Sequence, residues 1–422
     1  MTQWMNQRRS LLGAAVGSIT CGAMAQGAPA VARPSPDQAM AQRIDRTLAL
    51  AVAQQRVVGA VVLVARDGLP VYQGAFGQAD REARRAMTVA TPFRLASMTK
   101  PIVTLAALRL AELGQIRLQA PVTDYLPDFR PRLADGSAPA ITLQQLLLHT
   151  SGLGYGFEEG PGGAYARLGV SDGLDRATLT LQENLRRLAQ APLYFAPGTQ
   201  WRYSLGIDVV GAVIERVTHR PLPQAVDALV LQPAALQGFA FSVPRRQRLA
   251  TPYANGQPRP VRMTRDMRVP IPGAPGAPGS GVVFDPARAY SASAFPSGGG
   301  GMIGTAPGYL RLLEVLRAGG APVLARAAPA GWMQPLVGPQ AQTQGPGWGF
   351  GYGGAVLVDP VAAASPQSAG TLQWGGAYGH NWFIDPPQRL SVVMLTNTAF
   401  EGMNGALVTQ LRDAVYGAAP AA

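Results

Sequence analysis

Two residue types that often carry catalysis or bind metals are nearly absent from this chain of 422 residues. It contains one cysteine, Cys21, and three histidines, His149, His219 and His380. Zinc sites need several closely spaced cysteine or histidine ligands, and the sequence has no H-E-x-x-H motif. We therefore expect no metal site, and no other cofactor is implied.

Lysine is equally scarce, because Lys100 is the single lysine among the 36 lysine and arginine residues. Either residue type can supply surface charge. An arginine guanidinium stays protonated in proteins, whereas an ammonium can lose its proton when it is buried or lies near another cation. The one amine that the chain retains is therefore a candidate catalytic base.

Acidic residues are few as well: 24 Asp and Glu residues against 36 Lys and Arg residues give a formal net charge of +12. A basic protein can bind nucleic acid, but here the arginines are scattered and no nucleic-acid-binding motif accompanies them. The densest groups are Arg81, Arg84 and Arg85, and Arg245, Arg246 and Arg248. We expect no nucleic-acid partner. Hydrophobic residues make up 47% of the chain, which is enough for a large folded core.

The N-terminal segment has the features of an export signal. Arg8-Arg9 precedes an apolar stretch, Leu11 to Ala25, that ends on the small-residue cleavage pattern Ala23-Met24-Ala25. The paired arginines favour a twin-arginine signal. We expect residues 1–25 to be removed and the protein to be periplasmic or secreted, so that Cys21 is lost and cysteine catalysis is excluded. No segment is long enough to span a bilayer comfortably, so no stable membrane insertion is expected.

Apolar strand patterns occur near both ends of the chain, and helical patterns occupy its middle. After a Pro-rich linker at residues 26–36, the end segments are expected to be a helix Asp37–Gln54, strands Val57–Arg66 and Leu69–Phe76 joined by the turn Asp67-Gly68, strands Thr371–Ile384 and Leu390–Thr396, and a helix Gly402–Tyr416. Helices are expected in the middle at Lys100–Leu113, Leu143–His149, Leu179–Ala189 and Ile207–Val217, followed by a long loop Pro258–Ser297. The pattern predicts an α/β (α+β) fold with a cleft, in which residues 37–100 and 300–417 form a sheet domain and residues 101–299 form an inserted α-rich domain.

The first motif that carries chemistry is Ser97-Met98-Thr99-Lys100, at the start of an expected helix. Residues three apart share a helix face, so the Ser97 hydroxyl and the Lys100 amine can touch. A serine hydroxyl is a poor nucleophile unless a neighbouring group takes its proton. The helix N-terminus would also stabilise negative charge that develops on the serine oxygen.

Two further motifs follow downstream. Tyr203-Ser204-Leu205 stands just before the helix that begins near Ile207, where its phenol could pass a proton to a leaving group or simply pack in the core. Trp374-Gly375-Gly376-Ala377-Tyr378 lies in an expected strand, where glycines mark either a bulge or a place that a ligand approaches closely. Such a strand edge can also offer a backbone N–H to an oxyanion.

The order Ser-x-x-Lys, Tyr-Ser-x and a late glycine-containing strand resembles the serine β-lactamase/penicillin-binding superfamily. The resemblance covers most of residues 37–417 and includes Leu147-Leu148-His149-Thr150-Ser151-Gly152-Leu153, Gly298 to Gly304 and Trp348-Gly349-Phe350-Gly351. It implies a β-lactamase/transpeptidase-like fold, with an antiparallel sheet built from both chain ends and flanked by helices. It also implies hydrolysis through an acyl-enzyme.

The resemblance assigns a role to each motif residue. Ser97 would be the nucleophile, Lys100 and Tyr203 its base pair, and the backbone N–H groups of Ser97 and Ala377 the oxyanion hole. Trp374 would line the acyl pocket, and the other expected substrate-binding residues are Leu205, Gly375, Gly376 and Tyr378.

Two departures from the superfamily pattern indicate a subgroup. Leu205 stands where class C β-lactamases and peptidases usually carry Asn, and Trp374-Gly375-Gly376 replaces Lys-Thr-Gly or His-x-Gly. Losing that cation removes a group that holds a substrate carboxylate. The motifs are similar to those of the family VIII carboxylesterases, and we expect a carboxylesterase acting on a small-molecule ester. A class C-type β-lactamase, a D-amino-acid amidase or peptidase, and an acyl-transferring or penicillin-binding protein with little turnover are the alternatives; the oligomeric state stays open.

Other patterns have simpler interpretations. Gly169-Val170-Ser171-Asp172-Gly173 matches G-x-S-x-G but lacks the strand that a nucleophile elbow requires. Gly299-x-Gly301-x-x-Gly304 matches a dinucleotide fingerprint without a preceding strand. His380 shares strand parity with Trp374, so it could face the cleft, although a packed role is favoured. Glu158 and Glu159 are interpreted as a solvated loop pair, with a deacylating base as the alternative.

Overall fold

Strands from both ends of the chain form one eight-stranded antiparallel sheet in the computed structural model, which describes residues 35–176, 178–273, 277–325 and 333–418. The order across the sheet is β10-β11-β12-β13-β14-β1-β2-β3. The strands are β1 (Gly59–Arg66), β2 (Leu69–Asp80), β3 (Arg85–Ala86), β10 (Trp348–Gly351), β11 (Gly354–Leu357), β12 (Leu372–Gly376), β13 (His380–Asp385) and β14 (Leu390–Thr396). The predicted sheet is confirmed. The predicted signal peptide, residues 1–25, lies outside the described residues.

The centre of the sheet joins the two ends of the chain directly. Strand β1 pairs with β14 over its length, with Val62 opposite Met394. It also pairs with β2 through the predicted turn, in which Asp67 and Gly68 have φ values of 54° and 82°. Positive φ at both central positions is what a tight hairpin with the right twist requires.

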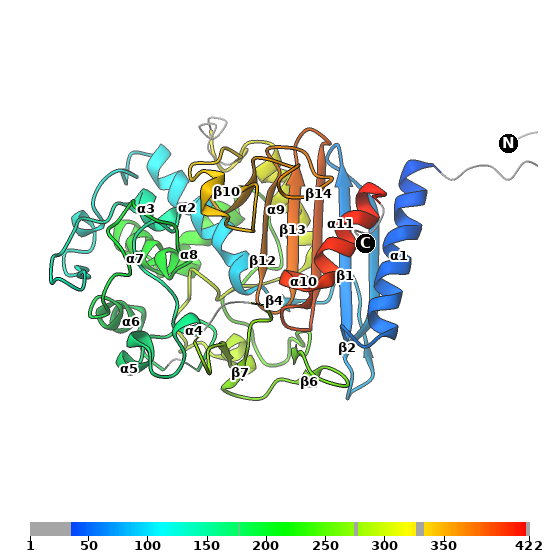
Figure 1. Ribbon diagram of the computed structural model, residues 1–422, viewed down its shortest axis with the longest axis horizontal. Helices are drawn as coiled ribbons and strands as arrows, with labels where there is room; N and C mark the ends of the chain where they lie inside the picture. The colour runs from blue at the N-terminus through cyan, green and yellow to red at the C-terminus, as the bar shows by residue number, and fades with distance from the viewer. Residues whose placement is uncertain (1–34, 177, 274–276, 326–332, 419–422) are drawn as a thin grey trace, which may run out of the picture. The chain divides into compact units, whose positions relative to one another are not determined.

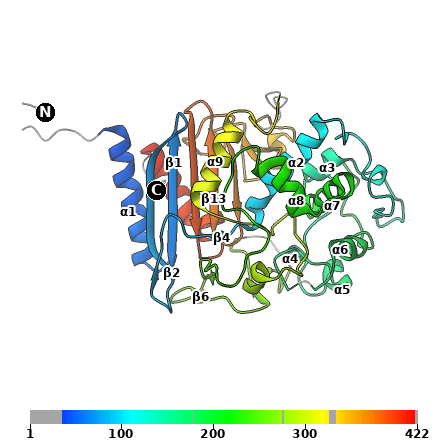
Figure 2. The ribbon, with the colours of Figure 1, turned by 180° about the vertical axis from the view of Figure 1, so that it is seen from behind.

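Both faces of the central strands are buried, and the side-chain alternation of a strand divides them between two cores. Val61 and Leu63 belong to the core that includes the helical middle of the chain, whereas Val62 and Val64 pack with α1 (Pro36–Ala53) and α11 (Ala406–Tyr416). In Figure 1, α11 lies across the front of the sheet. Figure 2 shows α9 (Ala306–Arg317) on the opposite face.

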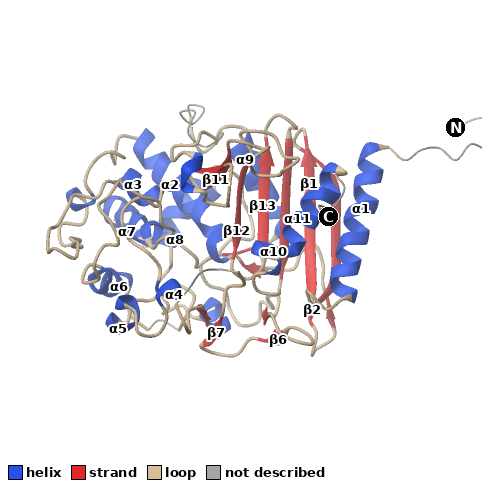
Figure 3. Cartoon of the chain, in the orientation of Figure 1, coloured by secondary structure: helices blue, strands red, loops and turns tan. Residues whose placement is uncertain are grey.

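The middle of the chain is helical, as predicted, and lies beside the sheet (Figure 3). Its helices are α2 (Lys100–Glu112), α3 (Leu143–Leu147), α4 (Gly156–Glu159), α5 (Ala164–Leu168), α6 (Leu181–Leu188), α7 (Gly206–Thr218) and α8 (Leu222–Val226). The division into two domains at residues 100 and 300 stays a prediction. Within the described ranges, none of the helices has the length and apolarity that a membrane crossing requires.

Three expected elements differ from the structure. The predicted strand Thr371–Ile384 is two strands, β12 and β13, because the chain turns back at Gly379, whose φ is 103°. The predicted helix Gly402–Tyr416 divides at Gly405 into α10 (Glu401–Asn404) and α11. The expected loop Pro258–Ser297 contains the short strands β6 (Val261–Arg262), β7 (Met267–Val269) and β8 (Val282–Phe284). In all three places the structure depends on a glycine or on strands of two or three residues, and neither feature produces a hydrophobic pattern in the sequence.

Candidate active site

Ser97 lies at a sharp entry into α2. Strand β4 (Phe93–Arg94) pairs with β9 (Ile303–Gly304), and a 3₁₀ turn Ala96–Thr99 then leads into the helix. Ala96 has a φ of 46°, in the left-handed region that a residue with a side chain rarely adopts. The surrounding structure fixes this turn, since Tyr309 Oη donates to the Met98 carbonyl at 3.1 Å and Met302 N donates to Thr99 Oγ1 at 3.1 Å. Strain held in this way is typical of functional turns.

Lys100 is buried directly below Ser97, with 3% of its surface exposed. Its Nζ lies 3.4 Å from Ser97 Oγ and donates to the Gly299 carbonyl at 2.7 Å. The same nitrogen lies 4.5 Å from the ring centre of Tyr203 and 5.2 Å from that of Tyr155. No ion pair joins Lys100 to a carboxylate among the described residues. An amine held by a carbonyl and two rings, next to the serine hydroxyl, is well placed to accept a proton.

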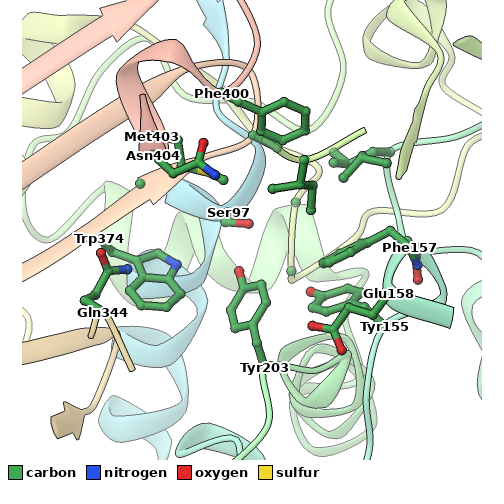
Figure 4. Close-up of a pocket in the computed structure, with 18 of the residues that line it drawn as sticks. Ser97, Tyr155, Phe157, Glu158, Tyr203, Gln344, Trp374, Phe400, Met403 and Asn404 are labelled. Carbon is green, nitrogen blue, oxygen red and sulfur yellow. Dashed lines mark hydrogen bonds between the residues drawn. The ribbon is translucent and has the colours of Figure 1, made fainter. Parts of the chain in front are cut away.

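Tyr203 reaches the same place from the loop before α7. Figure 4 shows its hydroxyl directed toward Ser97. That hydroxyl is buried and has no hydrogen-bond partner among the described residues. Its neighbour Ser204 is held by His149, whose Nδ1 accepts the Ser204 N–H at 3.2 Å and whose ring lies 4.8 Å from the Tyr203 ring. Burial holds the pKa of His149 well below its usual value, so this imidazole is a neutral support for the tyrosine loop.

The end of β12 forms the opposite side of the site. Trp374, Gly375 and Ala377 line the same cavity as Ser97, and the Trp374 ring lies 5.3 Å from the Tyr203 ring. Gly376 presses against the Ser97 turn, since a Cβ on it would lie 2.4 Å from the Leu95 carbonyl oxygen. Only glycine permits this approach of β12 to the nucleophile.

The other predicted substrate-binding residues lie behind the cavity wall. Leu205 is fully buried at the start of α7, and Tyr378 packs its ring 4.8 Å from that of Phe284. Neither they nor Gly376 belong to the described residues that line the cavity. Leu205 and Gly376 therefore position neighbouring residues, because Tyr203 and Ala377 beside them face the cavity.

The cavity has a volume of about 340 Å³ and is mostly apolar. Aromatic side chains dominate its wall: Tyr155, Phe157, Trp201, Tyr203, Trp374 and Phe400. Leu174, Ile271, Val282 and Met403 add aliphatic surface, and Thr343, Gln344, Asn381 and Asn404 add neutral polar groups. The cavity can therefore hold a small organic molecule beside Ser97. Within the parts of the chain that are described, no cluster of His, Cys, Asp and Glu side chains could hold a metal ion.

Gly299 has a role at the site that no motif in the sequence indicates. Its carbonyl accepts from Lys100, and a Cβ on it would lie 2.4 Å from Asp208 Oδ2 and 3.0 Å from Tyr155 Oη. The glycine run that matches a dinucleotide fingerprint is therefore a tight backbone passage beside the amine. A strand does not precede it, since residues 297–300 form a turn before β9.

The serine of the G-x-S-x-G match, Ser171, does not lie at the cavity. Ser171 is buried and donates its hydroxyl to Asp175, away from the cavity. Asp172 beside it lines the cavity and accepts the N–H groups of Gly156 and Phe157 at 2.8 and 2.9 Å. Burial raises the pKa of Asp172 to about 7. The segment holds α4 in place at the cavity wall.

The interpretation of Glu158 and Glu159 as a solvated pair was wrong. Glu158 lines the cavity and pairs with Arg202 at 2.6 Å, and burial raises the pKa of its carboxyl. Glu159 accepts the N–H of Tyr165 at 2.8 Å and the hydroxyl of Tyr194. Sequence spacing could not reveal this, because the partners come from other segments.

His380 does not face the cavity, because the turn at Gly379 breaks the strand parity on which that alternative depended. It is fully buried, with Nε2 donating to the Arg94 carbonyl at 2.8 Å and Nδ1 accepting the Thr396 N–H at 3.2 Å. The packed role favoured from the sequence is confirmed. Burial lowers its pKa to about 4.

Comparisons with known proteins agree with this geometry. The sequence model of the family described as Beta-lactamase matches residues 41–416. Esterase EstB of Burkholderia gladioli is 55% identical over 380 residues, which cover 89% of this chain and 95% of that protein. Monacolin J acid methylbutanoyltransferase of Aspergillus terreus is 26% identical over 377 residues, covering 80% of this chain and 85% of that protein. The solved structure of EstCE1, described as a hydrolase with promiscuous acyltransferase activity, has a TM-score of 0.88 at 48% identity and covers 90% of this chain and 99% of its own.

Proposed function

Because this chain belongs to the beta-lactamase family, we propose that it is a serine carboxylesterase that acts through an acyl-enzyme on Ser97. The observation that carries the proposal is the Lys100 amine 3.4 Å from the Ser97 hydroxyl, at the floor of an apolar cavity. The 55% identity to Esterase EstB supports an ester as the substrate.

The proposed reaction has two halves. Lys100, with Tyr203 beside it, takes the proton of Ser97 Oγ while that oxygen attacks the ester carbonyl. The N–H groups of Ser97 and Ala377 stabilise the oxyanion. Tyr203 relays the proton to the alcohol oxygen as the ester C–O bond breaks. In the second half Tyr203 activates a water that hydrolyses the acyl-enzyme and returns the proton to Ser97.

The charge of the cavity supports an ester over a β-lactam or a peptide carboxylate. No lysine or arginine occurs among the described residues that line it. Trp374 stands where a cation would hold a substrate carboxylate, so an anionic substrate would be desolvated without a partner. A neutral carbonyl compound avoids that cost.

Transfer of the acyl group to an alcohol is a second candidate activity. It is favoured by EstCE1, whose description includes promiscuous acyltransferase activity and which is 48% identical to this chain. An apolar, aromatic wall binds organic alcohols better than water, so an added alcohol could intercept the acyl-enzyme.

Turnover of a nitrophenyl ester beside nitrocefin tests the proposal. We expect sustained ester hydrolysis by the wild type, little nitrocefin hydrolysis and no ester turnover by Ser97→Ala. Nitrocefin turnover above ester turnover would establish the β-lactamase alternative. A single burst of nitrophenol without turnover would instead indicate a protein that acylates and stalls.

We further propose that the protein is exported, on the Arg8-Arg9 pair and the Ala23-Met24-Ala25 pattern. N-terminal sequencing of the protein from the producing cell is expected to begin at Gln26. Replacing both arginines by lysine is expected to leave the uncleaved chain in the cytoplasm. Cleavage and export that persist in this variant would contradict a twin-arginine route.

A further inference from the structure

One wall of the cavity carries a carboxylate whose function the proposed reaction does not use. Glu158 lies on α4, and Figure 4 shows its side chain on the side of the pocket formed by Tyr155 and Tyr203. The helix is anchored there because the Asp172 carboxylate accepts the N–H groups of Gly156 and Phe157. The carboxylate is therefore held at the cavity rather than free in solvent.

The pairing of Glu158 leaves part of its charge available. Arg202 Nη2 contacts Glu158 Oε2 at 2.6 Å, and Arg202 does not line the cavity. Glu158 Oε1 has no hydrogen-bond or ion-pair partner among the described residues. The arginine therefore occupies one carboxylate oxygen from outside the cavity lining, and the second oxygen has no partner of its own in the described part of the chain.

The neighbouring side chains are aromatic. Tyr155 and Phe157 stack with ring centres 4.7 Å apart, so each covers one face of the other, and Tyr155 lies 5.1 Å from Tyr203. An ammonium group is attracted by the negative face of an aromatic ring, and in this pair the outer face of Phe157 is the one that the stack leaves uncovered. An aromatic wall with one open carboxylate, in a cavity without a cationic lining residue among those described, favours positive charge over negative charge.

We propose that the cavity selects esters whose alcohol part carries an ammonium group, with Glu158 and the Tyr155–Phe157 stack as the cation subsite. The inference rests on the proposed esterase function. It assigns the cation to the alcohol because Trp374, the proposed acyl-side residue, lies on the opposite side of Tyr203 from Glu158 in Figure 4.

The proposed subsite uses a different carboxylate and different contacts from those that hold the catalytic amine. Lys100 Nζ lies 5.2 Å from the ring centre of Tyr155 and 4.5 Å from that of Tyr203, and it donates to the Gly299 carbonyl. A substrate ammonium paired with Glu158 does not compete for that carbonyl. Selection for the cation is therefore compatible with the chemistry at Ser97.

A matched pair of esters tests the inference. Acetylcholine and 3,3-dimethylbutyl acetate have the same shape, with the quaternary nitrogen of one replaced by carbon in the other. We expect wild-type kcat/KM to be about tenfold or more higher for acetylcholine. Equal values, or a preference for the neutral ester, would overturn the cation subsite. Hydrolysis of neither ester, nor of a nitrophenyl ester, would instead overturn the proposed function.

Two variants test whether Glu158 is responsible for the expected preference for acetylcholine. Glu158→Gln leaves Arg202 without its partner and is expected to lower the acetylcholine to dimethylbutyl acetate ratio to about one or below. Glu159→Gln is the matched control, since it removes the same charge from the same helix outside the cavity lining, and it is expected to keep the wild-type ratio. An unchanged ratio in Glu158→Gln would contradict the assignment.

A measurement on the wild type alone keeps the test independent of variant folding. Tetramethylammonium chloride is expected to inhibit hydrolysis of 3,3-dimethylbutyl acetate competitively, whereas sodium chloride at equal ionic strength is not. Equal effects of the two salts would also overturn the subsite.

Discussion

At the scale of single residues, the distance between parts of a site along the chain decides what a sequence can reveal. Ser97 and Lys100 are a helical turn apart, so their contact follows from helix geometry alone. Gly299, which holds the amine, lies 199 residues from Lys100 in the sequence. Glu158 meets Arg202 in the same non-local way. Contacts of this kind depend on the folded arrangement of loops, which no local pattern encodes.

Gly299→Ala tests the support of the amine. The new Cβ would lie 2.4 Å from Asp208 Oδ2 and 3.0 Å from Tyr155 Oη, so either these buried side chains or the Gly299 backbone, whose carbonyl accepts from Lys100, must move. We expect kcat for a nitrophenyl ester to fall about 100-fold or more, because small displacements of catalytic groups have effects of that size.

Gly300→Ala is the control for this change. The nearest atom to its Cβ is a methyl carbon of Leu174 at 3.1 Å, which can rotate away. We expect a smaller loss of kcat than in Gly299→Ala, with circular dichroism confirming that both variants fold. A Gly299→Ala enzyme with normal kcat would show that this carbonyl does not position Lys100.

At the scale of elements, strands β12 and β13 show what an apolar pattern can and cannot indicate. The mostly apolar segment Thr371–Ile384 correctly indicated strand structure on both sides of residue 378, but it did not reveal the reversal between the strands. The reversal depends on Gly379, which has a φ of 103° and on which a Cβ would lie only 1.9 Å from the Thr398 carbonyl oxygen. A glycine among several others in the same segment gives no local sign of that contact.

Gly379→Ala is expected to destabilise the protein by at least about 3 kcal/mol, from the positive φ together with the clash. Chemical denaturation measures this loss. Gly370→Ala provides the matched control, because Gly370 has a φ of 86° but a Cβ added to it would meet no atom within 4 Å. The free energy of unfolding of Gly370→Ala is expected to fall only by the cost of placing alanine at a positive φ. Similar losses in both variants would mean that the contact with Thr398 carries little energy.

Burial of His380, the first residue of β13, makes the stability of the fold depend on pH. Its folded pKa is lowered to about 4 from an ordinary value of 6.5, so between these limits the unfolded chain binds more protons at this site. Its contribution to stability is therefore full above pH 6.5 and is lost as the pH falls toward 4. The shift corresponds to at most about 3 kcal/mol.

His380→Gln tests this linkage through the pH slope of the free energy of unfolding. The variant is expected to lose less stability than the wild type between pH 6.5 and pH 4, whatever its stability at neutral pH. Parallel slopes would show that His380 does not titrate differently in the folded and unfolded chains.

At the scale of the whole molecule, the sheet from the two chain ends and the helical middle were predictable because apolar runs indicate the strands and helically spaced apolar residues indicate the helices. That the two faces of β1 belong to different cores, with Val61 on one face and Val62 on the other, follows from the folded structure, since β1 is apolar throughout. The cavity was not predictable in detail. Its wall combines α4, the loop before α7, the glycine run near residue 299 and the end of β12, which are brought together only by tertiary packing.

The presence of one lysine in a chain with 36 lysine and arginine residues makes the central claim directly testable. Lys100→Arg keeps a long basic side chain but removes the only side-chain amine, and a guanidinium cannot act as a base at this site. The decisive measurement is kcat/KM of this variant for a nitrophenyl ester, with its fold confirmed by circular dichroism. We predict a loss of about 1,000-fold or more relative to the wild type. A Lys100→Arg enzyme within about tenfold of the wild-type value would contradict proton transfer from Ser97 to Lys100.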